Sequence, residues 1–366
     1  MHIAILIGHF PPGSFGGAEL QAEGWARRLV DRHRVTVITR QDPPGQPERE
    51  EREGFRVVRL PLSRIPVWRT FADLGAIDRA IRQLEPRPDV LLCFQTFLSG
   101  LAGVRVQRAT GIPAVVWIRG EAEYRFDQSR VHRWVSPGVW RDAAGVLVQS
   151  EENRAELLRA LERERPSIVD TVRGKLEVVT NGSELPQGPF RTGTRVLSVG
   201  RLIPDKGMDT VIDASAAAAA PLTIAGDGPE RARLEQRAQL AGGEVRFTGF
   251  ASREQLDALY RDASCVVLAA RRGEGLPNVL LEAMAHARPV IATACAGTRD
   301  LLVDEVNGLQ IQADDVAGLQ RAMLRLRTEP GLAERLGAEG RRTAERFTWE
   351  RVRPGLERVL SRWGAA

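Results

Sequence analysis

Short apolar runs alternate with amphipathic segments along almost the whole chain. The run from Ile3 to Ile7 is continuous and β-branched, which is typical of a strand in a parallel sheet covered on both faces. Apolar residues at helical spacing follow over about 18–30. Further strands are expected at 35–39, 55–60, 90–94, 114–118, 145–149 and 176–180, with helices between them. This alternation predicts an α/β fold with parallel sheets.

A chain of 366 residues is too long for one ordinary domain and predicts two. Around Asn181 the sequence TNGSELPQGPFRTGTR is rich in Gly, Pro and Ser, which indicates an interdomain hinge. A second α/β unit is expected to follow, with strands at 195–200, 222–225, 245–248, 265–269 and 289–293 and a helical tail at 330–363. We expect domains at 1–183 and 184–347. Residues 41–53 are Pro-rich and charged, which predicts a mobile surface loop.

Composition argues against several classes of protein. With 43% hydrophobic and 27% charged residues the chain is typical of a globular protein, and no apolar run approaches the roughly 20 residues of a membrane span. The N-terminal MHIAILIGHFPP lacks the features of a signal peptide, and the three cysteines favour a reducing compartment, so we expect a cytoplasmic protein. The net charge of +5 arises from basic residues interleaved with Glu and Asp, so we expect no nucleic-acid partner.

Two glutamates stand out in ARRGEGLPNVLLEAMAHARPVIAT, residues 270–293, which reads as a strand end, a glycine-rich loop, a helix and a second strand. Pro277 is expected at the first helical position, where its missing N–H has no partner to lose. A phosphate at this helix start would have Glu274 on one side and Glu282 on the other. The N–H groups expected to bind it belong to Leu276, Asn278 and Val279. The alternative is a solvated loop glutamate and a second glutamate on the helix surface.

The form E-GLPNVLL-E followed by AMAHARPVIAT resembles the signature of the retaining glycosyltransferases of family 4. The resemblance implies a GT-B fold, in which two Rossmann-like domains face each other across a cleft and the last helix, about 348–366, packs back on the first domain. The N-terminal domain would bind the acceptor and the C-terminal domain the nucleotide-sugar. Glu274 would approach the donor sugar and Glu282 would hydrogen-bond the ribose. Further donor contacts would come from Gly275, Leu276, Pro277, Asn278 and Val279.

Three further stretches match the family in the expected order. GHFPPGSFGGAELQ resembles its N-terminal glycine loop, in which Gly16 and Gly17 let the backbone approach the diphosphate and acceptor closely. SVGRLIPDKGMDTVIDA would place Arg201 and Lys206 to hold a departing diphosphate, and the alternative is two surface cations beside a turn. LTIAGDGPERARLE and FTGFASREQL are expected near the base and ribose, where they supply Gly226, Gly228 and Phe250. The last of these could equally be ordinary packing.

The predicted chemistry relies on positive charge. Displacing a nucleoside diphosphate from a sugar builds negative charge on the leaving oxygens, which preorganised cations and a helix start stabilise. The Asp-x-Asp pair that holds the metal in many glycosyltransferases does not occur in this sequence, so we expect neither a metal nor a cofactor. The resemblance implies that the donor phosphate accepts the acceptor's proton. A UDP- or GDP-sugar is the expected donor, and the expected acceptor is a sugar, lipid-linked or small-molecule hydroxyl.

Two positions depart from the family. Many members carry a His after the strand that matches AVVWI, where this chain has Arg119, and an arginine cannot serve as a base at neutral pH. Arg119 could instead bind a substrate carboxylate or phosphate, or pair with Glu121 or Glu123. His9 is a candidate substitute, and Asp300 stands where the family usually has Glu. The catalytic candidates are therefore Glu274, Arg201, Lys206 and Arg119.

The acceptor region is the least readable part of the chain. Residues 124–141 mix arginines with aromatic residues and, together with 65–69, could form a basic-aromatic face on the first domain. Such a face would contact anionic lipid at the inner face of a membrane, or a lipid-linked acceptor. The alternative is that the aromatic residues pack in the core. They are Tyr124, Phe126, Trp134 and Trp140.

The expected function is synthesis of a glycolipid, a polysaccharide or a small-metabolite glycoside. One alternative is a GT-B-type nucleotide-sugar epimerase, which depends on a different set of carboxylates and histidines. The five histidines here give that alternative little support. The other alternative is a nucleotide-sugar-binding protein whose catalysis was lost with the missing His.

Overall fold

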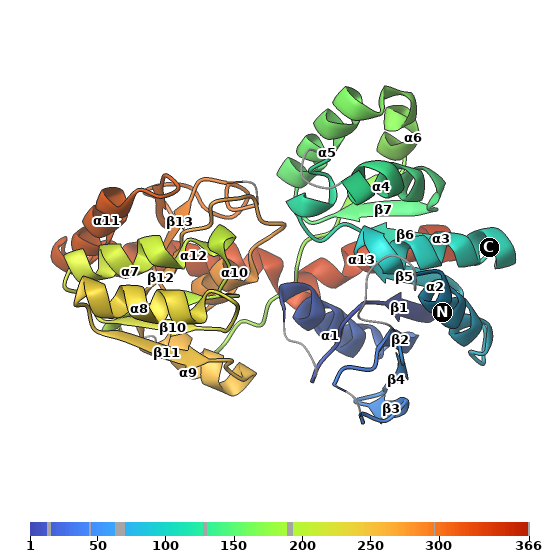
Figure 1. The fold of residues 1–366 in the computed structure, drawn as a ribbon, viewed down its shortest axis with the longest axis horizontal. Helices are drawn as coiled ribbons and strands as arrows, with labels where there is room; N and C mark the ends of the chain where they lie inside the picture. Colours follow the sequence, from blue (N-terminus) through green and yellow to red (C-terminus); the bar gives the residue numbers. More distant parts are fainter. Residues whose placement is uncertain are drawn as a thin grey trace. The chain divides into compact units, whose positions relative to one another are not determined.

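The computed structural model describes residues 1–12, 16–43, 45–62, 70–126, 130–188, 193–295 and 297–364. The chain forms two compact units (Figure 1). Unit 1 comprises Met1–Gly182 together with Trp349–Ala366, and unit 2 comprises Ser183–Thr348. The chain thus leaves unit 1 at Gly182 and returns to it for its last helix.

Unit 1 is built on a sheet with the strand order β3-β4-β2-β1-β5-β6-β7-β8. Its parallel strands are β1 His2–Leu6, β2 Arg34–Arg40, β4 Phe55–Leu60, β5 Val90–Phe94, β6 Ala114–Trp117, β7 Gly145–Val148 and β8 Leu176–Val178. The expectation of a loop at 41–53 was wrong at its end, because Arg49–Arg52 forms β3, which pairs antiparallel with β4. Its REER sequence suits a charged edge strand, which resists pairing with another chain.

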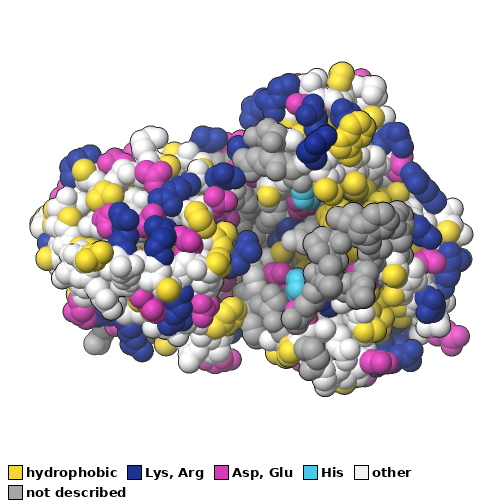
Figure 2. Space-filling model, in the orientation of Figure 1, with side chains coloured by type: hydrophobic (Ala, Val, Ile, Leu, Met, Phe, Trp, Pro, Cys, Tyr) yellow, Lys and Arg dark blue, Asp and Glu magenta, His cyan; other side chains and the backbone are white. Residues whose placement is uncertain are grey.

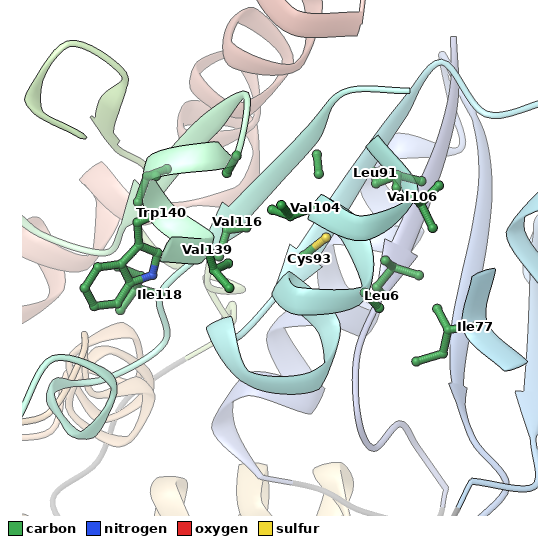
Figure 3. Close-up of a cluster of buried hydrophobic side chains, with 14 of the residues drawn as sticks. Leu6, Ile77, Leu91, Cys93, Val104, Val106, Val116, Ile118, Val139 and Trp140 are labelled. Atoms are coloured by element: carbon green, nitrogen blue, oxygen red, sulfur yellow. The ribbon is translucent and has the colours of Figure 1, made fainter. Parts of the chain in front are cut away.

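Helices cover both faces of this sheet. One face packs against α2 Thr70–Arg82, α3 Leu101–Thr110, α4 Arg130–Asp142, α5 Glu151–Glu164 and α6 Val169–Arg173, and the other against α1 Gly17–Leu29 and α13 Trp349–Gly364. Figure 3 shows part of the first core, where Leu6 and Leu91 from the sheet face Ile77 and Val106 from the helices. Burial on both faces explains why these strands are continuous apolar runs rather than alternating ones.

Unit 2 repeats this layering with the strand order β11-β10-β9-β12-β13-β14, all parallel. Its strands are β9 Arg195–Val199, β10 Leu222–Ala225, β11 Val245–Gly249, β12 Ala263–Leu268, β13 Val290–Thr293 and β14 Leu309–Ile311. Its helices are α7 Met208–Ala217, α8 Arg231–Ala241, α9 Arg253–Asp262, α10 Asn278–Ala285, α11 Val316–Thr328 and α12 Leu332–Ala344. The predicted α/β class and its strands are confirmed to within about two residues. Helices α4, α6 and α11 and strand β14 were not predicted.

The last helix is held in unit 1 by an aromatic contact. Trp349, at the start of α13, is 5% exposed, and its ring meets that of Trp25 of α1 edge to face with centroids 5.1 Å apart. Gly24 and Gly182 lie so close to the Trp349 ring that a Cβ at either position would be within 2.4 Å of it. This fit leaves no space for a different side chain at either glycine.

We expect Trp349→Ala to lower the free energy of unfolding of unit 1 by about 3–5 kcal/mol, because it removes a large buried side chain and leaves a cavity. The matched control is Trp134→Ala, since Trp134 is 74% exposed and should cost less than about 1 kcal/mol. Urea unfolding followed by tryptophan fluorescence and circular dichroism measures both. Equal losses in the two variants would contradict this account of α13.

Candidate active site

Most predicted donor residues of unit 2 lie in loops at the carboxyl ends of parallel strands, which meet at one edge of a sheet, and the other three, Asn278, Val279 and Glu282, lie in α10. The loops after β9 and β10 are hydrogen-bonded to each other, Leu202 N to Asp227 O at 2.9 Å and Glu230 N to Leu202 O at 3.0 Å. Gly226 makes this possible, because it has φ +145° and a Cβ there would lie 1.9 Å from Gly200 O. Gly228 makes a second close approach, since a Cβ there would lie 2.4 Å from Leu202 O.

Lys206 and Glu274 form an ion pair through Nζ and Oε1. Lys206 ends the short 3-10 turn Pro204–Lys206 after β9, and Glu274 lies in the loop after β12. Their side chains are only 20% and 22% exposed. The next residue, Gly207, has φ +61°, and a Cβ there would lie 2.1 Å from Ala269 O at the end of β12. Two predicted site residues 68 positions apart are thus brought together, whereas an exposed surface lysine would point into solvent.

Arg201 is not part of this pair. It is exposed, and its side chain makes no hydrogen bond or ion pair with any residue that the structure describes. Arg201 therefore lies three residues before Pro204, on the same loop as Lys206, and its guanidinium is not held by a hydrogen bond or ion pair to a described residue.

Helix α10 starts one residue later than predicted. Asn278 is its first residue and Pro277 is the N-cap, with φ −72° and an extended ψ of 108°. The carbonyl of Pro277 accepts hydrogen bonds from Leu280 N and Leu281 N, both at 3.2 Å. The N–H of Val279 meets no acceptor within the described ranges. The loop that leads into this helix start contains Gly275 and the buried Leu276, so the helix N-terminus follows directly on Glu274.

Glu282 is part of a hydrogen-bonded cluster and is not a solvated residue of the helix surface. Its Oε2 accepts a hydrogen bond of 2.8 Å from the Tyr260 hydroxyl, and Tyr260 is 2% exposed. The Tyr260 ring stacks on His286 with centroids 5.1 Å apart. His286 Nε2 lies 2.7 Å from Asp257 Oδ1. Burial raises the pKa of the Glu282 carboxyl, and the hydrogen bond from Tyr260 opposes that rise. Sequence reasoning missed Tyr260, because nothing in α9 marks it as a partner of a residue 22 positions away.

The remaining candidates lie in unit 1. Arg119 follows β6, and its guanidinium stacks over Trp117 at 4.8 Å and Phe94 at 5.1 Å. Its Nη2 donates to Asn181 Oδ1 at 2.8 Å. Nε and Nη1 are buried without a hydrogen-bond partner among the described residues. Burial lowers the pKa of Arg119 to about 9, with Glu123 and Glu19 opposing, so the side chain stays charged at neutral pH.

The predicted pairing of Arg119 with an acidic neighbour takes a different form. Glu123 Oε1 accepts a hydrogen bond of 2.6 Å from the main-chain N of Arg119, and Glu121 pairs with Arg125. Gly16 is the N-cap of α1, and Gly17 is its first residue. The charge of Glu19, in the first turn of α1, acts on Arg119. Unit 1 therefore places the start of α1, which carries Gly16, Gly17 and Glu19, near Arg119.

Two other expectations are corrected by burial. Phe250 is 58% exposed, so it is not ordinary core packing and follows Gly249 at the end of β11. The four aromatic residues of 124–141 do not form one surface face, because three of them are buried and only Trp134, with Arg165 stacked at 5.4 Å, is exposed. The buried residues are Tyr124, Phe126 and Trp140. Residues 65–69 lie outside the described ranges.

The last two candidates, His9 and Asp300, lie away from the buried contacts described above. His9 Nδ1 lies 3.4 Å from Asp42 Oδ2, and Asp300 is exposed.

Within the described ranges, no helix is both long and apolar enough to cross a membrane. Nor do the described residues include a group of three or more His, Cys, Asp or Glu that could hold a metal ion. Figure 2 shows Lys and Arg interleaved with Asp and Glu over the face in view.

Two family models match this chain. One described as "Glycosyl transferase 4-like domain" matches residues 16–182, and one described as "Glycosyl transferases group 1" matches residues 186–343. A GDP-mannose-dependent alpha-mannosyltransferase of Mycobacterium tuberculosis is 29% identical over 76% of this chain and 75% of its own length. The two matched stretches correspond closely to the unit 1 core and to unit 2.

Solved structures show the same fold. Sucrose-phosphate synthase from Thermosynechococcus elongatus superposes with a TM-score of 0.87 at 23% identity, covering 100% of this chain and 99% of that chain. Anabaena HepE in complex with UDP and glucose superposes with a TM-score of 0.81 at 19% identity, covering 98% and 99%.

Burial of Glu282 predicts a pH dependence of stability in unit 2. Its pKa in the folded protein is raised above the ordinary 4.5, so as pH rises above 4.5 the unfolded chain ionises first. The unfolded state then binds fewer protons than the folded state, and stability falls until pH passes the folded pKa. We expect Glu282→Gln to abolish this part of the fall between pH 4.5 and pH 7 in urea unfolding. Glu334→Gln, at an exposed residue, is the control, and identical pH dependence in both variants would contradict the assignment.

Proposed function

This chain belongs to the glycosyl transferases group 1 family and is a glycosyltransferase, and we propose that it moves a sugar from a UDP- or GDP-sugar to a hydroxyl acceptor with retention of configuration and without a metal. The observation that carries the proposal is the ion pair of Lys206 and Glu274 beside the start of α10. The acceptor class proposed is a glycolipid, polysaccharide or small-metabolite precursor. The Anabaena HepE complex with UDP and glucose and the GDP-mannose-dependent relative motivate the two nucleotide choices.

In the proposed mechanism, positive charge stabilises the leaving diphosphate. The ammonium of Lys206 is held in a partly buried position, where its charge is less screened than in water. The N-terminus of α10 adds its partial positive charge, and the N–H of Val279 is the proposed donor to a phosphate oxygen. Arg201, on the same loop as Lys206, supplies a second cation. Together these groups do what a bound metal does in other transferases.

The chemical step balances without a protein base. The bond between C1 of the sugar and the diphosphate oxygen breaks, and its electron pair goes to that oxygen. The acceptor oxygen forms the new bond to C1 on the same face, and its proton passes to the departing phosphate oxygen. This route is compatible with an arginine at position 119, because Arg119 stays protonated and cannot accept a proton. Arg119 contributes a buried positive charge that favours an anionic group on the substrate.

The other residues are assigned to binding. Glu274 is the proposed partner of sugar hydroxyls, and Glu282, oriented by Tyr260, of the ribose hydroxyls. Phe250 is proposed to stack on the base, since it is a large exposed aromatic side chain next to Gly249. Gly16 and Gly17 in unit 1, and Gly226 and Gly228 in unit 2, let the main chain approach the donor.

A thermal-shift screen of UDP, GDP and their sugars identifies the donor, because a ligand that binds only the folded state raises its stability. With that donor, we expect Lys206→Ala and Glu274→Ala to lower the transfer rate about 100-fold, since each removes a group that stabilises the transition state. The control is Arg246→Ala, at an exposed residue of β11, which should keep the wild-type rate. Release of nucleoside diphosphate measures the rate, and proton NMR of the product reports its anomeric configuration. A wild-type rate in Lys206→Ala would refute the phosphate site.

Metal independence has its own test. We expect the transfer rate in excess EDTA to equal the rate in Mg²⁺ or Mn²⁺ within about twofold, because cationic side chains and a helix start would supply the charge. The comparison uses enzyme dialysed against EDTA, with the metal added back in parallel samples. A loss of activity in EDTA that the added metal restores would show this part of the proposal to be wrong.

A further inference from the structure

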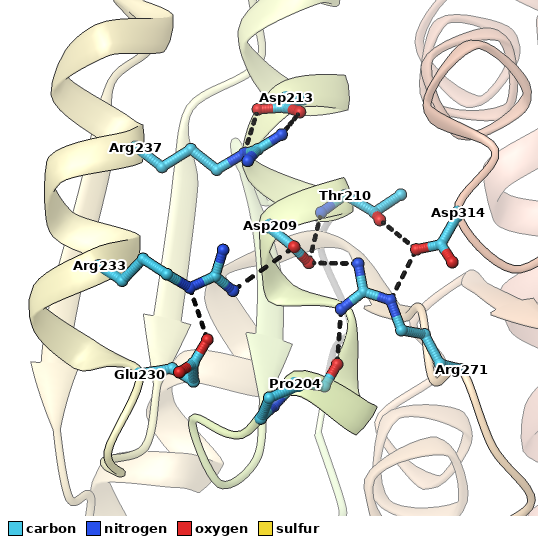
Figure 4. A network of polar contacts seen from close by, with 9 residues as sticks. All are labelled: Pro204, Asp209, Thr210, Asp213, Glu230, Arg233, Arg237, Arg271 and Asp314. Carbon is cyan, nitrogen blue, oxygen red and sulfur yellow. Dashed lines mark hydrogen bonds and ion pairs between the residues drawn. The ribbon is translucent and has the colours of Figure 1, made fainter.

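Arg271, in the loop after β12, ties together three segments around the Lys206 turn (Figure 4). Its guanidinium donates hydrogen bonds from all three nitrogens, to Pro204 O at 2.6 Å, Asp209 Oδ1 at 2.8 Å and Asp314 Oδ1 at 2.7 Å. Its main-chain N donates to Asp205 O at 2.8 Å. One residue therefore binds two of the three residues in the turn Pro204–Lys206 and the first turn of α7.

These contacts fix the Lys206 turn against the loop that carries Glu274. Lys206 is the last residue of the turn and Glu274 lies three residues after Arg271, so the Arg271 contacts and the ion pair join the same two segments. Arg272 adds a longer contact of 3.4 Å to Asp205 Oδ1. A flexible four-carbon side chain such as that of Lys206 delivers its charge to a defined point only if its main chain is held in place.

A second arginine in the same region offers a natural comparison. Arg237 of α8 makes a two-point contact with Asp213 of α7, one turn along the helix from Asp209. Figure 4 shows that the Arg237 contact joins two helices and does not reach the turn at Pro204. Both arginines thus make two contacts to carboxylate oxygens, through Nε and Nη2, and of the two only Arg271 also binds the loop at Pro204.

We propose that Arg271 is a positioning residue, which holds the turn Pro204–Lys206 so that the Lys206 ammonium meets the diphosphate of the nucleotide. The inference rests on the proposed function, because it assumes that Lys206 binds the diphosphate. Arg271 itself touches no substrate in this account. It acts through three hydrogen bonds to the turn and its flanks, and a lysine in its place could form only part of that set.

The test compares binding of UDP and GDP with binding of uridine and guanosine, which lack phosphates, by calorimetry or thermal shift. We expect Lys206→Ala to weaken binding of the preferred diphosphate by about 10- to 100-fold, as loss of a charge-assisted hydrogen bond should. Arg271→Gln should weaken binding of the diphosphate by about tenfold and leave nucleoside binding unchanged. Arg271→Lys should bind the diphosphate with an affinity between those of the wild type and Arg271→Gln. Arg237→Gln should match the wild type in both assays.

A double-variant measurement separates positioning from general destabilisation. Because Arg271 acts through Lys206, Arg271→Gln combined with Lys206→Ala should bind the diphosphate no more weakly than Lys206→Ala alone. Additive losses, or equal losses of nucleoside and diphosphate binding, would overturn the inference. If Arg271→Gln binds the diphosphate like the wild type and Lys206→Ala binds it more weakly, the positioning role of Arg271 is overturned and the phosphate site stands. Wild-type diphosphate binding in Lys206→Ala would overturn the phosphate site itself. If Arg271→Gln does not fold, the same comparisons apply to Arg271→Lys.

Discussion

The ion pair between Lys206 and Glu274 is the interaction on which the rest of the candidate site depends. The two residues meet because β9 and β12 are neighbours in a parallel sheet, so the loops after them leave the same edge side by side. Glycine at position 207 lets the two loops approach to a distance at which any Cβ would collide with Ala269 O. The pair is therefore a consequence of strand order as much as of the two side chains.

Sequence reasoning located most of the fold because burial on both faces makes parallel strands visible as continuous apolar runs. The runs at Phe55–Leu60 and Val90–Phe94 were found with both ends correct. It failed where local composition says little about structure. The REER sequence of β3 becomes a strand only through pairing with β4, and α4 contains Pro137 in its interior, which ordinarily argues against a helix.

The candidate site divides in the same way. Glu274, Glu282 and Lys206 could be identified because each lies in a motif of fixed spacing. Arg271 and Tyr260 could not, because their partners lie on other strands and helices, and an arginine among so many others carries no signal of its own. Loop geometry decides which of two adjacent arginines, 271 or 272, turns its guanidinium to the Pro204 carbonyl.

The two glutamates of one motif end in opposite environments. Glu274 lies in a partly exposed loop and pairs with the ammonium of Lys206. Glu282 lies eight residues later, against a buried phenol. Burial raises the pKa of its carboxyl, and the hydrogen bond from Tyr260, together with the charges of Arg253 and His286, opposes the rise. Spacing along the chain fixes where both carboxyls lie, but the elements packed against each one determine its hydrogen-bond and ion-pair partners. A motif thus predicts positions better than it predicts partners, which here are Lys206 for Glu274 and Tyr260 for Glu282.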